Sequence, residues 1–176
     1  MKVFAFLLSA LLLPLTAPAQ SGAPARPAGA AAEAISLPPG TGPGVHGANS
    51  PFAPLAERTD VISWSTLTTV STRTEKNRVL PVYPVPVMAL NQKTQRVQGF
   101  MMPLEPGEKQ KHFLLSAVPM SCSFCVPGGP ESMVEVKTRV PVAYSLDAIV
   151  VEGRFAVLAD DPYGLYYRMT DAVGVK

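Results

Sequence analysis

The sequence predicts a mainly β protein, a small antiparallel barrel of about five or six strands with a short N-terminal helix. Apolar and polar residues alternate along much of the chain after residue 78, turn signals separate the alternating segments, and no amphipathic helix interrupts them. Closure into a barrel is expected because consecutive short strands would otherwise leave exposed edges. A length of 176 residues fits one such domain together with a targeting segment.

The first 19 residues have the features of a secretory signal peptide. Lys2 gives a positive start, an apolar segment follows, and small residues precede the expected cleavage between Ala19 and Gln20. The apolar segment is shorter than the roughly 20 residues that cross a bilayer, and no Cys near the cleavage position could be acylated. We expect a periplasmic protein of a Gram-negative bacterium, or a secreted one, with no stable membrane insertion after cleavage.

Residues 20–56 are rich in Ala, Pro and Gly and show no hydrophobic period. Such a composition buries too little apolar surface to offset chain entropy, so a flexible leader is expected. The barrel domain is assigned to residues 57–176. Near its start, Asp60 is expected to cap a short helix that carries Trp64 and Leu67 on one face.

Six segments of the domain are expected to be strands, with turn signals at 91–94 and 106–107. In the clearest of them, Val151 and Phe155 point to one side while Glu152 and Arg154 point to the other, as in a strand with one solvated face. The six segments are residues 85–90, 95–102, 111–118, 133–138, 148–158 and 164–170.

The charge balance argues against a nucleic-acid partner. Cleavage removes Lys2 from the 15 basic residues and leaves the 13 acidic ones, so the mature protein is close to neutral. Binding to nucleic acid or to anionic lipid normally depends on a basic surface, and no basic stripe with interleaved aromatic residues is present. There is also no Gly-x-Ser-x-Gly turn and no phosphate-binding Gly loop, so the sequence favours a protein that is not an enzyme.

Cys122 and Cys125 form a single C-x-x-C motif in a Pro- and Gly-rich loop between two expected strands. This spacing lets both sulfurs face one point, as in half of a tetrahedral zinc site. Cys with His would suit zinc, and Cys with Met would suit Cu(I). The first candidates for further ligands are His112 and Met120, which lie nearest in sequence, followed by His46, Met101, Met102 and Glu131.

Two alternatives to a metal site remain open for this motif. In an oxidising compartment Cys122 and Cys125 can form a disulfide that fixes the loop of a structural or protein-interaction module. A thiol redox catalyst is the third hypothesis, but it would need a helix directly after the motif to lower a thiol pKa. The sequence continues instead with Pro and Gly residues over 127–130, which prevent such a helix.

Several segments together resemble a bacterial family of exported proteins, domain of unknown function 3299. They are Gln98-Gly99-Phe100-Met101-Met102-Pro103-Leu104-Glu105, Phe113-Leu114-Leu115, the Cys122 loop, Met133-Val134-Glu135-Val136, Val151-Glu152-Gly153 and Tyr166-Tyr167-Arg168-Met169. The resemblance implies an OB-like β-barrel in the periplasm, often beside transport systems for transition metals, and no established reaction. The family pattern has Cys-x-His where this chain has Cys122-Ser123-Phe124-Cys125.

The leading hypothesis from the sequence is therefore a periplasmic accessory protein that binds zinc or copper through Cys122 and Cys125, aided by neighbours such as His112 and Met120. The runner-up is an interaction module with a Cys122–Cys125 disulfide. In either case the expected partner is an envelope transporter or another periplasmic protein.

Overall fold

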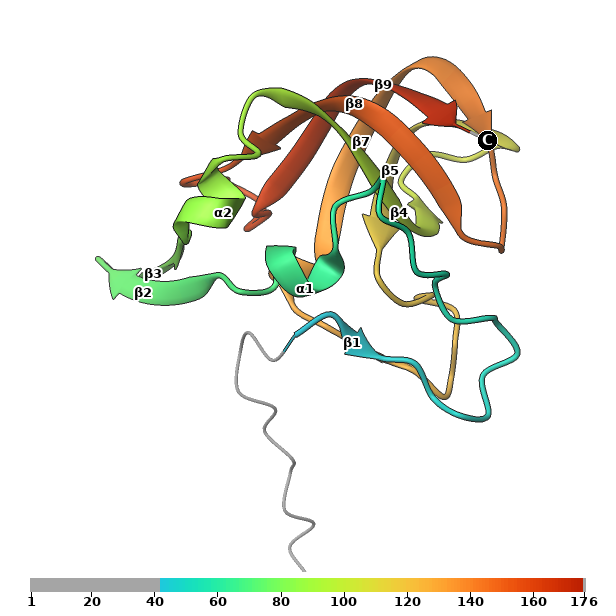
Figure 1. The fold of residues 1–176 in the computed structure, drawn as a ribbon, viewed down its shortest axis with the longest axis horizontal. Coiled ribbons are helices and arrows are strands. Elements are labelled where there is room, and N and C mark those ends of the chain that lie inside the picture. Colours follow the sequence, from blue (N-terminus) through green and yellow to red (C-terminus); the bar gives the residue numbers. More distant parts are fainter. Residues whose placement is uncertain (1–41, 176) are drawn as a thin grey trace, which may run out of the picture. The chain divides into compact units, whose positions relative to one another are not determined.

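The computed structural model describes residues 42–175, and five of its strands close into a barrel (Figure 1). Their order around the barrel is β4-β5-β7-β9-β8. The prediction of a mainly β protein with a small closed barrel is confirmed. The barrel strands are β4 (Lys93–Pro103), β5 (Lys109–Ser116), β7 (Met133–Ala143), β8 (Ile149–Val157) and β9 (Tyr167–Val175).

The strand order is that of an OB-like Greek-key barrel. All neighbouring strands pair antiparallel except β7 and β9, which run parallel with Glu135 opposite Arg168. The parallel pair follows from the connection after β7. The chain first crosses the barrel so that β8 pairs with β4, and β9 then returns antiparallel to β8 and lies beside β7. Near this ladder Asp171 has a φ of 53°, and the pairing shifts register between Thr138 and Val136.

Five of the six predicted strand segments overlap the barrel strands, but the prediction for 85–90 is wrong. There the chain forms the short helix α2 (Val85–Met88). The valines suggested a strand, whereas Pro86 fits the first turn of a helix, where its missing N–H has no role. Within 164–170, the strand begins only at Tyr167, and the preceding Tyr166 is buried.

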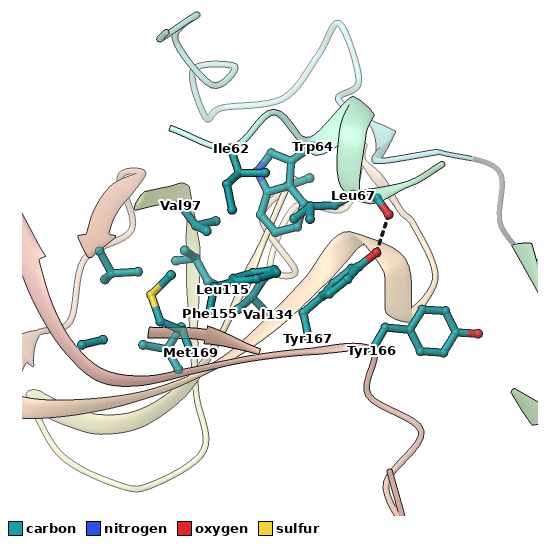
Figure 2. Close-up of a cluster of buried hydrophobic side chains, with 14 of the residues drawn as sticks. Ile62, Trp64, Leu67, Val97, Leu115, Val134, Phe155, Tyr166, Tyr167 and Met169 are labelled. Atoms are coloured by element: carbon teal, nitrogen blue, oxygen red, sulfur yellow. Dashed lines mark hydrogen bonds between the residues drawn. The ribbon is translucent and has the colours of Figure 1, made fainter. Parts of the chain in front are cut away.

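The predicted helix is α1 (Trp64–Leu67), and it contributes to the barrel core (Figure 2). Its cap is Ser63 and not Asp60: the Ser63 side chain accepts from the Ser65 N–H, whereas the Asp60 carboxylate pairs with Arg58 and Arg96. Leu67 is fully buried, and its carbonyl accepts a 2.6 Å hydrogen bond from the Tyr167 hydroxyl.

Smaller elements surround the barrel. Strands β2 (Ser71–Glu75) and β3 (Arg78–Val82) form a hairpin whose turn residues, Lys76 and Asn77, have φ of 48° and 62°. Strand β1 (Gly44–Val45) pairs with β6 (Val126–Pro127), and the 3-10 turn η1 (Pro130–Ser132) leads into β7. Neither of these two small sheets was predicted from the sequence.

The predicted signal peptide, its cleavage position between Ala19 and Gln20, and residues 20–41 of the predicted leader lie outside the described residues. The rest of the predicted leader, residues 42–56, is described and includes β1. Within 42–175, none of the helices has the length and apolar character needed to span a bilayer.

Candidate functional site

Cys122 and Cys125 are joined by a disulfide in the loop between β5 and β6. Their Cα atoms are 5.3 Å apart, and two successive turns shape the loop. The Cys122 N–H donates to the Pro119 carbonyl and the Cys125 N–H to the Cys122 carbonyl, both at 3.2 Å. The covalent bond and the two turns together define the shape of the segment around Phe124.

Residues 44–50, which we call the arm, lie against this loop. Val45 pairs with Val126 in the β1–β6 ladder, and the Ser50 hydroxyl oxygen lies 3.3 Å from the Cys122 sulfur. The backbones approach so closely that a Cβ on Gly47 would overlap the carbonyl oxygen of Phe124. Part of the segment predicted as a flexible leader therefore takes part in forming the site.

The residues proposed as metal ligands do not fit a metal ion in this structure. The Cys122 and Cys125 sulfurs are bonded to each other, so neither is available as a thiolate. His112 donates from Nε2 to the Glu135 carboxylate at 2.7 Å, and the Met120 side chain is 42% exposed. Among residues 42–175 there is no group of three or more His, Cys, Asp and Glu side chains arranged to hold a metal. The metal hypothesis remains a prediction about a reduced form.

The remaining proposed ligands have other surroundings. The His46 Nε2–H donates to the Phe52 carbonyl at 2.8 Å, and the ring stacks on Phe100. Met101 belongs to the core, while a Glu131 carboxylate oxygen accepts from the Gly129 N–H at 3.1 Å. These contacts give His46, Met101 and Glu131 structural roles in the fold, while Met102 lies half-buried on β4.

The chain after Cys125 enters strand β6 directly. A helix at this point would be needed to stabilise a thiolate in the manner of a thioredoxin-like catalyst. Its place is taken by a strand and then by η1, as the Pro and Gly residues of the loop predict. The geometry therefore gives no support to the redox hypothesis.

The loop and the arm expose several large apolar side chains. Phe124 is 58% exposed although its neighbour Cys122 is buried. Val45 and Val126, which face each other across the ladder, are 63% and 43% exposed. With Met120 they form what we call the loop patch. Sequence reasoning selected this loop for its cysteines and gave no role to its apolar residues.

A group of polar side chains, separate from the loop patch, lies on β5, β7 and β9. Glu135 is only 7% exposed, yet it accepts hydrogen bonds from His112 and Arg168 and lies 3.4 Å from the Lys137 ammonium. Burial by itself would raise the pKa of Glu135, but the hydrogen bonds from Arg168 and His112 and the attraction of the neighbouring cations outweigh it and lower the pKa. Glu135 is thus a buried carboxylate that stays charged.

Arg168 also reaches Asp161, in the connection between β8 and β9, where its Nη2 lies 3.4 Å from Oδ2. Neither Glu135 nor Asp161 was predicted as a site residue from the sequence. A carboxylate between two valines, Val134 and Val136, was the available signal, but alternation alone assigns such a residue to the solvated face.

Comparison with known proteins places this geometry in a family. The model of the family described as "Protein of unknown function (DUF3299)" matches residues 50–167, which is more than half of the chain. The chain belongs to the DUF3299 family. The match covers the disulfide loop, the complete strands β4, β5, β7 and β8, and the first residue of β9, while the β1 strand of the arm precedes it. The family resemblance inferred from the sequence is confirmed.

A solved DUF3299 protein, from Pseudomonas aeruginosa PAO1, is similar to this chain. The two share 28% sequence identity with a TM-score of 0.41 over 50% of this chain. The match covers 64% of the length of the other protein, so this chain spans less than two thirds of it. No curated protein matches this DUF3299 chain significantly.

Proposed function

We propose that this DUF3299 chain is an exported protein-interaction module of the cell envelope, and that its disulfide-fixed loop carries the surface that binds the partner. The observation that carries the proposal is the exposure of Phe124, at 58%, in a loop fixed on both sides by covalent and backbone contacts. A large aromatic side chain held outside the core is typical of binding surfaces.

The disulfide supports the proposed compartment. Disulfides persist in oxidising environments such as the periplasm and are rare where glutathione and thioredoxin keep thiols reduced. A C-x-x-C disulfide closes only a small ring, so its main effect is on the shape of the loop around Phe124. A preformed loop lowers the entropy cost of binding, because the contact side chains are already positioned.

The proposed partner is an envelope protein, either a transporter component or a periplasmic protein, that covers the loop patch with apolar side chains. Attraction between opposite net charges is not required, since the mature chain is expected to be close to neutral. Burial of apolar surface would then supply most of the binding free energy, at about 25 cal/mol per Å² before the costs of association.

Site-specific photocrosslinking in the host bacterium tests this function. The photoreactive residue p-benzoylphenylalanine replaces Phe124 in one variant and Val140, which is 62% exposed on β7, in a matched control. We expect a discrete adduct with one protein from position 124 and none from position 140. Equal labelling from both positions, or no adduct at 124, would contradict the proposal.

A metal titration separates this function from metal binding. The oxidised protein and a reduced sample with two free thiols are titrated with Zn(II) and with Cu(I) in the absence of oxygen. The interaction function requires crosslinking by the oxidised form and predicts no tight stoichiometric metal binding by that form. Tight binding by the reduced form, lost in both Cys122→Ser and Cys125→Ser, would favour the metal hypothesis instead.

A further inference from the structure

The β2–β3 hairpin extends away from the barrel and is largely solvated (Figure 1). All five residues of β2 (Ser71–Glu75) are exposed, and on β3 Val79 is 62% exposed. Among residues 42–175, β2 pairs only with β3, so its second edge is free. A two-stranded hairpin is only marginally stable alone, and an added strand would stabilise it.

The two edges of the hairpin differ in what they offer to an added strand. The turn has two residues, so the flanking pair, Glu75 and Arg78, exchanges both backbone hydrogen bonds. Alternation then directs the N–H and C=O groups of Thr72 and Thr74 toward the free edge of β2. On β3 the same alternation places Pro81 at the outer edge, where it has no N–H to donate. The edge of β2 is therefore the better template for pairing.

The charged side chains of β2 determine which strand can pair there. Arg73 and Glu75 are two residues apart and share one face of the strand, where the Arg73 Nη2 lies 3.5 Å from a Glu75 carboxylate oxygen. Charges on an edge strand normally oppose pairing with other strands. A strand with matching opposite charges escapes this repulsion, so the charges select the partner.

A second copy of β2 can meet the first about a two-fold axis, because the same surface then faces itself. On both strands the outward backbone groups belong to even-numbered residues, so the axis must pass through a residue and not between two residues. Axes at residues 72, 73 and 74 each leave three or more strand residues paired. These three registers differ in the side chain that faces Arg73.

The axis at Thr74 is the one that places opposite charges across from each other. With the axis at Arg73, the two Arg73 side chains face each other and repel. With the axis at Thr72, Arg73 faces the uncharged Ser71. With the axis at Thr74, Arg73 of each copy faces Glu75 of the other, in pairs without backbone hydrogen bonds, where side chains lie closest. The order of charges along β2 therefore selects one register.

We propose that β2 pairs antiparallel with β2 of a second copy of this chain about a two-fold axis at Thr74. The two Thr74 residues exchange both backbone hydrogen bonds, and two Arg73–Glu75 ion pairs flank them. The two hairpins then form one four-stranded sheet, and Val79, which faces Thr74 within each hairpin, extends the central row of β-branched side chains. An interface this short forms a weak, transient dimer. The surface is separate from the loop patch and goes beyond the function proposed for it.

Charge reversal tests both the dimer and its register. Sedimentation equilibrium of the mature protein, at concentrations up to roughly 1 mM, should show a reversible monomer–dimer equilibrium. Arg73→Glu and Glu75→Arg should each weaken dimerisation about tenfold or more, because like charges then face each other. The double variant Arg73→Glu/Glu75→Arg should restore it, since opposite charges face each other again. A monomer at every concentration, or a double variant as weak as the single ones, would overturn the proposal.

Thr74→Pro tests the backbone hydrogen bonds, and Val79→Pro, on the outer edge of β3, is its matched control. Neither N–H takes part in the hairpin ladder, so both variants should fold, which circular dichroism checks. The Thr74 variant should dimerise about tenfold more weakly or less, and the Val79 variant should keep its affinity. An unchanged Thr74 variant, or equal losses in both, would also overturn the proposal. If either variant does not fold, the charge reversals decide alone. None of these results alters what is expected from crosslinking at Phe124.

Discussion

The barrel and the disulfide loop are held in shape by different interactions. The barrel buries Phe113, Phe155 and Tyr167 completely and connects its strands through long ladders, so each contact depends on many others. The loop has a two-residue ladder, one covalent bond and a close backbone contact with the arm. The difference indicates that the barrel determines global stability, whereas the shape of the loop can change without unfolding the protein.

The largest effect is expected from a substitution in the barrel core. Phe155→Ala should lower the free energy of unfolding by about 3–5 kcal/mol, because it removes a fully buried ring that stacks on Tyr167 and leaves a cavity. Urea denaturation of the mature protein, followed by tryptophan fluorescence, measures it. Phe124→Ala is the matched control in the loop patch and should change stability by less than about 0.5 kcal/mol. Similar losses in the two variants would remove the contrast between the regions.

Glu135→Gln should have the next largest effect, about 2 kcal/mol, because it leaves His112 without a charged acceptor and Arg168 with only the more distant Asp161 carboxylate. The pKa of Glu135 is lowered in the folded state, so the carboxylate stabilises the protein above an unfolded-state pKa of about 4.5. That contribution is lost as the pH falls through the lower folded pKa.

The measurement for Glu135 is a series of urea denaturations across this pH range. The natural protein should lose stability on acidification more steeply than the Glu135 variant does. Glu152→Gln is the control, since this carboxylate pairs with Arg96 at 2.6 Å but is 35% exposed, and its loss should cost about 0.5 kcal/mol. Parallel pH curves for the natural protein and the Glu135 variant would contradict the assigned role.

Loss of the disulfide should cost about 2 kcal/mol or less by the chain-entropy relation, because the closed loop spans only three residues in sequence. The double variant Cys122→Ser/Cys125→Ser should show faster amide exchange in the arm and the loop, with exchange in β8 little changed. Hydrogen exchange read by mass spectrometry separates these regions. Equal acceleration in β8 would mean that the loop and the barrel unfold together.

The sequence predicted the barrel strands well because each exposes one face and buries the other. Period two is visible in residues such as Val151 and Phe155, and it requires no knowledge of which strands pair. Helix α2 was mistaken for a strand because Val85 and Val87 favour strands, while a single turn is too short to show a helical period. The β2–β3 turn was missed because Lys76 and Asn77 adopt positive φ without a glycine.

The buried ion pair between Glu135 and Arg168 depends on pairing between strands that are far apart in sequence. The parallel alignment of β7 with β9 brings these residues opposite each other, and no local pattern encodes that register. The cysteine spacing identified the loop as a site but was compatible with a metal, a disulfide or a redox pair. The exposure of Phe124 depends on how the arm packs against the loop. The amino-acid composition identified the arm only as part of a leader rich in Ala, Pro and Gly, so this packing was not predicted.

The smallest effect is expected where the arm meets the loop. Gly47→Ala should force the arm away from the Phe124 carbonyl and cost about 1 kcal/mol, because the overlapping atom belongs to the backbone and cannot rotate aside. The control is Gly174→Ala, whose added Cβ would lie 3.5 Å from Val142 in ordinary contact. Limited proteolysis should cut the Gly47 variant sooner than the control within residues 42–56. If both variants resist equally, the arm does not depend on this close approach, and the loop patch would owe its shape to the disulfide alone.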